Sequence, residues 1–311
     1  MRILVAGATG VIGKQLIPRL VGAGHEVTGM TRSESKRRLV SDLGATPVIA
    51  DALDPEQVAT AVAEAEPEAI VHQLTALDDV NVRKFARSFA LTNRLRTEAT
   101  DHLLSAGRAA GVRRFVAQSF AGWPYARDGA AVKSEDEPLD PSPPAQMRET
   151  LEAIRYLERA VAEDDRIEGV ALRYGGFYGP GTSLAPGGEQ LEAIRRRRFP
   201  IVGDGGGMLS LIHVADAADA TAVALERGAS GVYNVVDDDP VPAREFITVL
   251  SEELGVGKPR RVPRWIGRLI AGEAAVTMLT EGRGASNAKA KRELGWEPKH
   301  ASWRDNLATG R

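Results

Sequence analysis

The chain has 311 residues, of which 40 are Lys or Arg and 42 are Asp or Glu, and it contains no cysteine. A net charge of -2 leaves no basic excess to neutralise a nucleic acid or an anionic membrane, and the lack of cysteine excludes disulfides and thiolate chemistry. Because the chain exceeds one compact core and has no apolar run near the length of a membrane span, we expect a cytoplasmic protein with one large α/β unit and a smaller lobe.

The first thirteen residues, MRILVAGATGVIG, are typical of a strand, a tight turn and a helix. Gly7 permits the turn, Gly10 lets backbone amides approach a phosphate, and Gly13 allows the helix to pack closely on the strand. The unpaired N–H groups at the helix N-terminus attract a diphosphate. We therefore predict a dinucleotide site formed by the residues of this turn: Gly7, Thr9, Gly10, Val11, Ile12 and Gly13.

The second predicted strand, residues 26–31, ends where a site for NAD usually carries an acidic residue. Thr31 occupies that position, Arg32 follows it, and three further basic residues lie close behind. A guanidinium suits the additional phosphate of NADP, because charge-assisted hydrogen bonds to phosphate are strong. The alternative is an ordinary solvated helix start. We predict NADP as the cofactor, with NAD less favoured.

Strands and helices alternate along the rest of the chain, which is typical of a doubly wound parallel sheet, the Rossmann fold. We expect a dinucleotide-binding domain over 1–173, to which 208–236 returns, and a smaller C-terminal substrate lobe formed by 174–207 and 237–311. Predicted strands lie at 47–50, 69–72, 114–118, 170–174, 209–214 and 232–235, and predicted helices include 89–111 and 240–255.

Several short motifs carry a resemblance to a known family: Gly7 to Gly13, Thr92-Asn93, Arg114 to Ser119, Leu172-Arg173-Tyr174, Tyr178-Gly179-Pro180, Ile212 to Asp216 and Lys291 to Trp296. Together they resemble the extended short-chain dehydrogenases/reductases of the NAD-dependent epimerase/dehydratase family. The resemblance implies further cofactor contacts from Asp51, Ala52, Leu53, Leu74, Thr75, Ala76, Asn93, Gln118, Tyr174, Gly176 and Phe177. It also implies a small-molecule substrate, with contacts from Tyr178, His213 and Arg283.

The family's catalytic pair, a tyrosine and a lysine four residues later, is missing from this chain. In the family the lysine lowers the pKa of the phenol, so that it transfers a proton near neutral pH. Aligning the helix by Glu158 places Thr150 and Ile154 at these two positions, where neither can do this work. Tyr156 lies two residues off the expected face. Any acid/base group of this protein is therefore non-standard.

The segment that follows the predicted strand 114–118 offers the candidates for that group. Ser119 lies one step before the position of the family's active-site hydroxyl, which Phe120 takes in a strict alignment. Tyr125 follows in an aromatic loop, where Trp123 and Phe120 offer a wall for a planar or apolar substrate. We predict Ser119 and Tyr125 as catalytic residues. The alternative is that Tyr125 and Trp123 only pack the seam between the lobes.

Three further features bear on the substrate, on metal binding and on phosphate binding. Nucleotide-sugar enzymes of the family usually carry an asparagine near Gly176, and its lack here favours another substrate. His213 lies between apolar residues, which is typical of a core histidine, and no partner at ligand spacing indicates a metal site. The arginines at 195–198 suit either a phosphate or the dipole at a helix end.

We therefore expect an NADP-dependent oxidoreductase, epimerase or dehydratase that acts on a small molecule other than a typical nucleotide sugar. The alternative is a catalytically silent NAD(P)-binding sensor or partner-binding protein. We expect no nucleic-acid and no membrane partner, and a homodimer is an open alternative.

Overall fold

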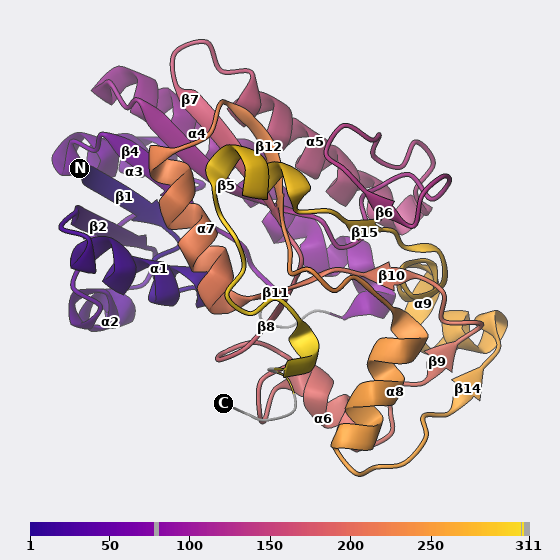
Figure 1. Cartoon of the computed structure of the whole chain (residues 1–311). Coiled ribbons are helices and arrows are strands. Elements are labelled where there is room, and N and C mark those ends of the chain that lie inside the picture. The colour runs from indigo at the N-terminus through magenta and orange to yellow at the C-terminus, as the bar shows by residue number, and fades with distance from the viewer. Residues whose placement is uncertain (78–80, 306, 308–311) are drawn as a thin grey trace.

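The computed structural model describes residues 1–77, 81–305 and 307, and its centre is a parallel sheet of seven strands (Figure 1). The strand order is β12-β7-β5-β4-β1-β2-β3. From β1 the chain adds β2 and β3 on one side and then returns to add β4, β5, β7 and β12 on the other, so the order reverses between β1 and β4. This confirms the Rossmann fold predicted from the sequence, whose ligands bind beyond the carboxyl ends of the strands at such a reversal. The strands are β1 (Arg2–Ala6), β2 (Glu26–Thr31), β3 (Thr46–Ile49), β4 (Ala69–His72), β5 (Arg114–Phe120), β7 (Glu168–Tyr174) and β12 (Gly231–Val235).

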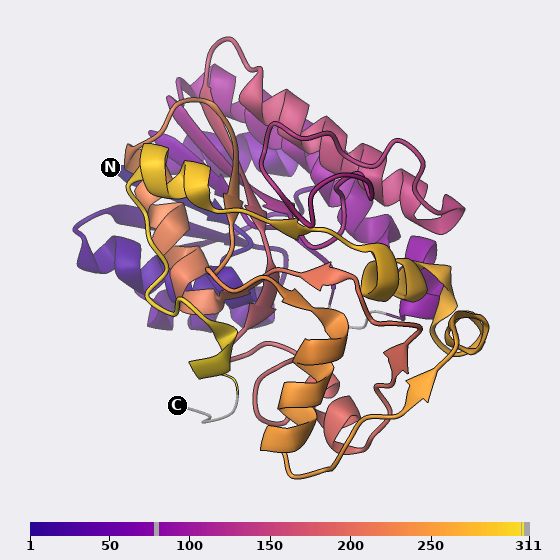
Figure 2. The ribbon, with the colours of Figure 1, turned by 45° about the vertical axis from the view of Figure 1, so that its right-hand side comes forward.

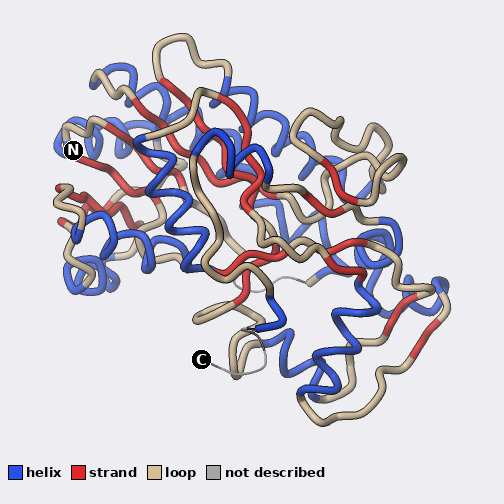
Figure 3. The backbone as a smooth tube through the Cα atoms, in the orientation of Figure 1, coloured by secondary structure: helices blue, strands red, loops and turns tan. Residues whose placement is uncertain are grey.

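Helices cover both faces of the sheet and shield its apolar strands from water (Figure 3). One face carries α1 (Val11–Gly22), α2 (Arg37–Asp42) and α7 (Val214–Glu226), and the π-helical turn η4 (Ala290–Leu294) adds to the same apolar core. The other face carries α3 (Pro55–Ala65), α4 (Phe85–Ala110) and α5 (Arg148–Ala162). The helix α3 begins where the Asp54 carboxylate accepts hydrogen bonds from two backbone N–H groups and Pro55 occupies the first turn.

A second group of elements lies below the sheet in the view of Figure 2 and packs around Phe246, Trp303 and Tyr178. Short strand pairs join it together and connect it to the sheet domain. It contains α6 (Glu189–Arg195), β9 (Ile201–Val202), β10 (Met208–Leu209), β13 (Val241–Pro242), α8 (Ala243–Glu253), β14 (Arg261–Val262), α9 (Arg264–Glu281) and η5 (Trp303–Asp305). The pairs β8 (Gly176–Tyr178) with β11 (Leu211–His213) and β6 (Val132–Lys133) with β15 (Gly284–Ala285) lie between the two groups. Short 3-10 turns complete the chain: η1 (Glu34–Lys36), η2 (Val82–Lys84) and η3 (Ala145–Met147).

The predicted strands 26–31 and 69–72 have the predicted bounds, and others differ for local reasons. The predicted strand 209–214 is broken at Ser210, because β10 pairs with β13 whereas β11 pairs with β8. The predicted helix 240–255 begins at Ala243, since Val241–Pro242 forms β13. The predicted helix 89–111 begins earlier, at Phe85. The predicted strand 114–118 extends to Phe120, so Ser119 lies inside β5. No helix of the described residues is long and apolar enough to cross a membrane.

Candidate active site

The turn between β1 and α1 has room for backbone only. Gly7 has φ 96°, a left-handed conformation, and a Cβ there would lie 2.7 Å from the carbonyl oxygen of Gln73. A Cβ on Gly13 would lie 2.4 Å from the carbonyl oxygen of Gly7. Gly10 is the N-cap of α1, and no side chain caps that helix end. The first N–H groups of α1 are therefore available to an anion, and this cradle fits the diphosphate of a dinucleotide.

The end of β2 presents a cation beside this turn. Thr31 is nearly buried and Arg32 is exposed. Within the described part of the chain, the Arg32 guanidinium makes no hydrogen bond or ion pair, whereas Arg37 is held by Glu34 at 2.7 Å. The Asp51 carboxylate accepts the N–H of Leu53 at 3.0 Å, which fixes the turn after β3. Arg32 is thus the guanidinium in this region that is free to meet an additional phosphate.

Other predicted cofactor residues meet along the carboxyl edge of the sheet. The Thr92 hydroxyl accepts the N–H of Ala76 at 3.0 Å, which ties the loop after β4 to α4. The Asn93 amide donates to the Thr150 hydroxyl at 3.2 Å. Of the remaining predicted contacts, Leu74, Thr75, Gln118, Gly176 and Phe177 are partly exposed and Ala52 is buried.

Tyr174 differs from this group, because its side chain is fully buried. Its hydroxyl lies 2.6 Å from the Thr221 hydroxyl and accepts the Gln73 amide at 3.1 Å. Burial raises the pKa of the phenol to about 12. The ring belongs to the core between the sheet and α7, which leaves it no surface for a cofactor in this structure.

A buried chain of hydrogen bonds joins the two predicted catalytic residues. The Ser119 hydroxyl donates to Glu158 at 2.6 Å, and Arg173 donates to both carboxylate oxygens of Glu158 at 2.7 Å. A further nitrogen of Arg173 donates to the Tyr125 hydroxyl at 3.0 Å, and that hydroxyl donates to Asn234 at 2.6 Å. Burial lowers the pKa of Arg173, but the hydrogen bonds and charge of Glu158 outweigh it and raise the pKa overall. The chain ties β5, α5, β7 and β12 together.

This arrangement argues against the role expected for Tyr125 as a proton donor. The phenol has no exposed surface, and its burial raises the pKa further, with Arg173 opposing only in part. Ser119 is also buried, and its proton is committed to Glu158. The sequence prediction does not include the ion pair of Glu158 with Arg173. The signal was available, since a carboxylate on a helix and an arginine on a core strand each need a buried partner.

Of the two positions of the family's catalytic pair, Ile154 lies in an apolar cluster and Thr150 accepts the hydrogen bond from Asn93. Thr150 and Ile154 are buried, and Ile154 packs in the same cluster as Phe120, Trp123 and Met147. The Trp123 ring packs edge to face against the Phe85 ring, with ring centroids 5.8 Å apart. The other side chains of this apolar cluster are Phe85, Phe89, Leu139, Leu151, Ala274 and Met278. Tyr156 is on the outer surface, where its hydroxyl donates to Asp101.

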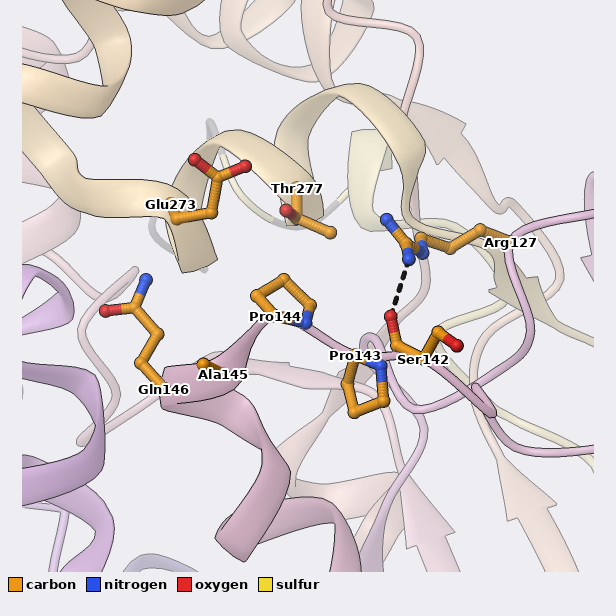
Figure 4. A pocket seen from close by; sticks show the side chains of 8 residues that line it. All are labelled: Arg127, Ser142, Pro143, Pro144, Ala145, Gln146, Glu273 and Thr277. Atoms are coloured by element: carbon orange, nitrogen blue, oxygen red, sulfur yellow. Dashed lines mark hydrogen bonds between the residues drawn. The ribbon is translucent and has the colours of Figure 1, made fainter.

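A pocket of about 500 Å³ opens beside the apolar cluster (Figure 4). Gln146, Glu273 and Thr277 line it and directly precede cluster members in the sequence. With its amide oxygen facing α9, Gln146 accepts the N–H groups of Glu273 at 3.1 Å and of Ala274 at 2.6 Å. The remaining lining residues are Arg127, Ser142, Pro143, Pro144 and Ala145. The Arg127 guanidinium forms ion pairs with the carboxylates of Asp140 and Glu281.

The predicted substrate residues divide between this pocket and the seam of the two lobes. Arg283 donates to the backbone carbonyl of Arg127, so it lies beside the pocket. Tyr178 is buried in the smaller lobe and meets the His213 ring edge to face at 5.2 Å. Burial, with help from the stacked ring of His300, lowers the pKa of His213 to about 4. His213 is thus a neutral packing group at the seam. Among the described residues, no three side chains of metal-binding type gather into a site.

Comparison with known proteins agrees with this geometry. The sequence matches the NAD dependent epimerase/dehydratase family over residues 3–236. A Streptomyces protein named 3-diazoavenalumate denitrifying reductase is 43% identical over 312 residues, which are 99% of each chain. A ketoreductase of Stigmatella aurantiaca that acts on a farnesyl dihydroquinoline oxide is 30% identical, over 82% of this chain and 74% of that protein.

Solved structures of nucleotide-sugar enzymes share the fold. A UDP-glucose 4-epimerase of Thermotoga maritima, solved with UDP-glucose, has a TM-score of 0.77 at 24% identity and covers 99% of this chain and 96% of its own. The UDP-glucose 4-epimerase of Thermus thermophilus, solved with NAD, has a TM-score of 0.74 at 25% identity and covers 100% and 98%.

Proposed function

The chain belongs to the NAD-dependent epimerase/dehydratase family and is an oxidoreductase or epimerase of the extended short-chain type, and from this premise we propose that it is an NADP-dependent reductase whose substrate accepts hydride without a proton from the protein. The observation that carries the proposal is the burial of both catalytic positions, with Ile154 in the apolar cluster. Thr150 and Ile154 replace the proton-transferring pair, and both are enclosed by protein.

The apolar cluster favours those reactions of the family that need no proton transfer by the protein. Epimerisation, dehydration and carbonyl reduction each move a proton on or off the substrate, and a positioned acid or base accelerates such a step by about 10² to 10⁴. Tyr125 and Ser119, the predicted candidates for such a group, are both buried, which disfavours these reactions. An apolar wall instead excludes water and suits a planar aromatic substrate.

An aryl diazonium acid is the substrate class that meets these conditions. Replacing its nitrogen by hydrogen needs one hydride: the new C–H bond forms with the hydride pair, the C–N bond breaks, and dinitrogen leaves with the bonding pair. No protein acid takes part in this balance. The relative that is 43% identical is named for the reductive removal of nitrogen from a diazo compound, which supports the same class here.

The chain's own residues would bind and orient the reactants. When bound, the reduced nicotinamide supplies the hydride. The turn at Gly7 and Gly10 would hold its diphosphate, and Arg32 would meet the additional phosphate of NADP. The ion pair of Glu158 with Arg173 holds the end of β5 in place. We propose the pocket lined by Gln146 and its neighbours as the entrance for the substrate.

A direct test supplies the protein with NADPH and a diazotised aminobenzoate as the probe. Oxidation of NADPH and release of dinitrogen are measured together against a mixture without protein, and the expected ratio is one to one. An aromatic ketone of similar size is the matched substrate, and its reduction should be slower by at least about a hundredfold, because no acid protonates its oxygen.

Faster reduction of the ketone than of the diazonium compound contradicts the proposal and restores a catalytic acid. Binding of NADPH without turnover of either compound instead favours the silent cofactor-binding protein. Arg32→Asp is the companion variant. It should change which cofactor the protein prefers and should leave the substrate's ability to accept hydride unchanged.

A further inference from the structure

The first half of α9 exposes large apolar side chains on one face. Trp265, Leu269 and Ile270 are 62%, 66% and 53% exposed, and two of them are one helical turn apart. The opposite face holds the helix to the protein through Gly267, where a Cβ would lie 2.6 Å from a methyl group of Val202. Of the large apolar residues that are exposed in the described chain, most lie on this short segment.

Basic residues lie in the segment that leads into this apolar face. Lys258, Arg260 and Arg261 are exposed, and within the described chain the side chains of all three are without an ion pair. They lie near Arg197, which donates to the Lys258 carbonyl at 3.1 Å, and β14 pairs with β9. The preceding Arg195 and Arg196 are paired with Glu192. The segment 258–271 contains no acidic residue. The overall net charge of -2, from which we expect no membrane partner, averages over this local excess.

We infer that this face docks on the surface of an anionic lipid membrane. Aromatic and aliphatic side chains on one side of a helix, flanked by lysines and arginines, are the features of a segment that lies in the headgroup layer. The segment is at the edge of the molecule beside β14, away from the sheet (Figure 1). A second copy of the chain would bring the same cations together, so charge complementarity favours an anionic surface over self-association.

The docking face and the candidate pocket are parts of the same helix. Gly272, with φ 85° and ψ 168°, interrupts α9, and the half that follows lines the pocket through Glu273 and Thr277. Ion pairs of Arg268 with Glu273 and of Arg264 with Glu281 connect the two halves. Docking would therefore hold the pocket close to the headgroup layer, where amphiphilic aromatic acids partition.

The test mixes the whole protein with vesicles of phosphatidylglycerol and phosphatidylcholine, or of phosphatidylcholine alone. Trp265 is the exposed tryptophan, because Trp123, Trp296 and Trp303 are at most 7% exposed. Its fluorescence should shift to shorter wavelength, and the protein should co-sediment, only with the anionic vesicles. High salt should reduce binding by at least about tenfold, since the attraction is screened.

Two variants identify the surface. Trp265→Ser with Leu269→Ser, and Arg260→Glu with Arg261→Glu, should each lower co-sedimentation by at least tenfold while circular dichroism stays unchanged. Arg166→Glu, an exposed arginine between α5 and β7 without a side-chain partner in the described chain, is the matched control and should bind as the parent does. Equal binding to neutral vesicles, or binding that survives both double variants, overturns the inference. Lack of binding to anionic vesicles overturns it as well and leaves an acidic protein as the partner that this face fits.

Discussion

The Tyr125 hydroxyl lies between Asn234 and Arg173, so Tyr125→Phe removes two buried hydrogen bonds and no exposed group. We expect a loss of about 1–3 kcal/mol in the free energy of unfolding, because both partners lose a hydrogen-bonding group. We expect kcat to stay within a few-fold. Urea unfolding and steady-state kinetics on one preparation check both, and a hundredfold fall in kcat with unchanged stability would restore Tyr125 as the acid.

Asp237 is 2% exposed, and burial raises the pKa of its carboxyl to about 8. The unfolded chain loses this proton near pH 4, so folding stability falls as the pH rises from about 4 to about 8. Asp237→Asn lacks this penalty. Between pH 4 and pH 8, the free energy of unfolding of this variant should increase relative to that of the parent by at least about 1.4 kcal/mol, which corresponds to one pKa unit. Urea unfolding at the two pH values measures it, and a gain that is equal at both would contradict the shift.

Arg32→Asp should reverse the cofactor preference. The parent is expected to bind NADPH about ten- to a hundredfold more tightly than NADH, which corresponds to one charge-assisted hydrogen bond. The aspartate would repel the additional phosphate and accept a ribose hydroxyl instead. Titration of both cofactors, followed by intrinsic fluorescence, gives the four dissociation constants. Equal affinities in the parent would remove Arg32 from the site.

Some residue roles could be predicted from the sequence and others could not. The demands on Gly7 and Gly13 are local, since each lacks room for a Cβ within one strand-turn-helix unit. The surroundings of Tyr125 are not local, because its partner Asn234 is 109 positions away in the sequence. A phenol in an aromatic loop gives no sign of whether a distant strand will cover it.

Among the secondary-structure elements, α5 allows two of its carboxylates to be compared. Glu158→Gln leaves the buried Arg173 without its ion pair and should lower the free energy of unfolding by about 3–5 kcal/mol. Glu152→Gln breaks an exposed pair with Arg155 on the same helix, and such pairs contribute about 0–1 kcal/mol. Chemical denaturation of both variants checks the contrast. A small effect at Glu158 would mean that the ion pair does not hold β5 and α5 together.

Elements whose apolar period is strong were predicted with accurate bounds, and those that change partners were not. The strand β4 is buried at all four positions, and its apolar run marks both ends. The break between β10 and β11 arises because the two strands pair with different partners, β13 and β8. The apolar pattern within 208–213 gives no indication of these partners. The kink of α9 at Gly272, where φ is 85°, also involves a distant segment, since a Cβ there would lie 3.2 Å from the Cα of Arg83.

For the molecule as a whole, none of the predicted site residues whose pKa is shifted moves toward neutrality. The pKa of His213 falls to about 4, that of Tyr174 rises to about 12, and burial raises that of Tyr125. We therefore expect kcat for the diazonium probe to change less than about twofold between pH 6 and pH 8, in contrast to the bell-shaped profile of acid–base catalysis. Initial rates at saturating NADPH test this, and a tenfold slope would reveal a titrating catalyst.

The strand β12, which pairs with β7 at the edge of the sheet, has a consequence for synthesis of the protein. During translation, β7 leaves the ribosome some sixty residues before β12, and until then its edge is open to pairing with other chains. The hydrogen bond from Tyr125 to Asn234 also waits for β12. Nascent chains that stop before residue 231 should therefore aggregate more readily than those that extend beyond residue 235.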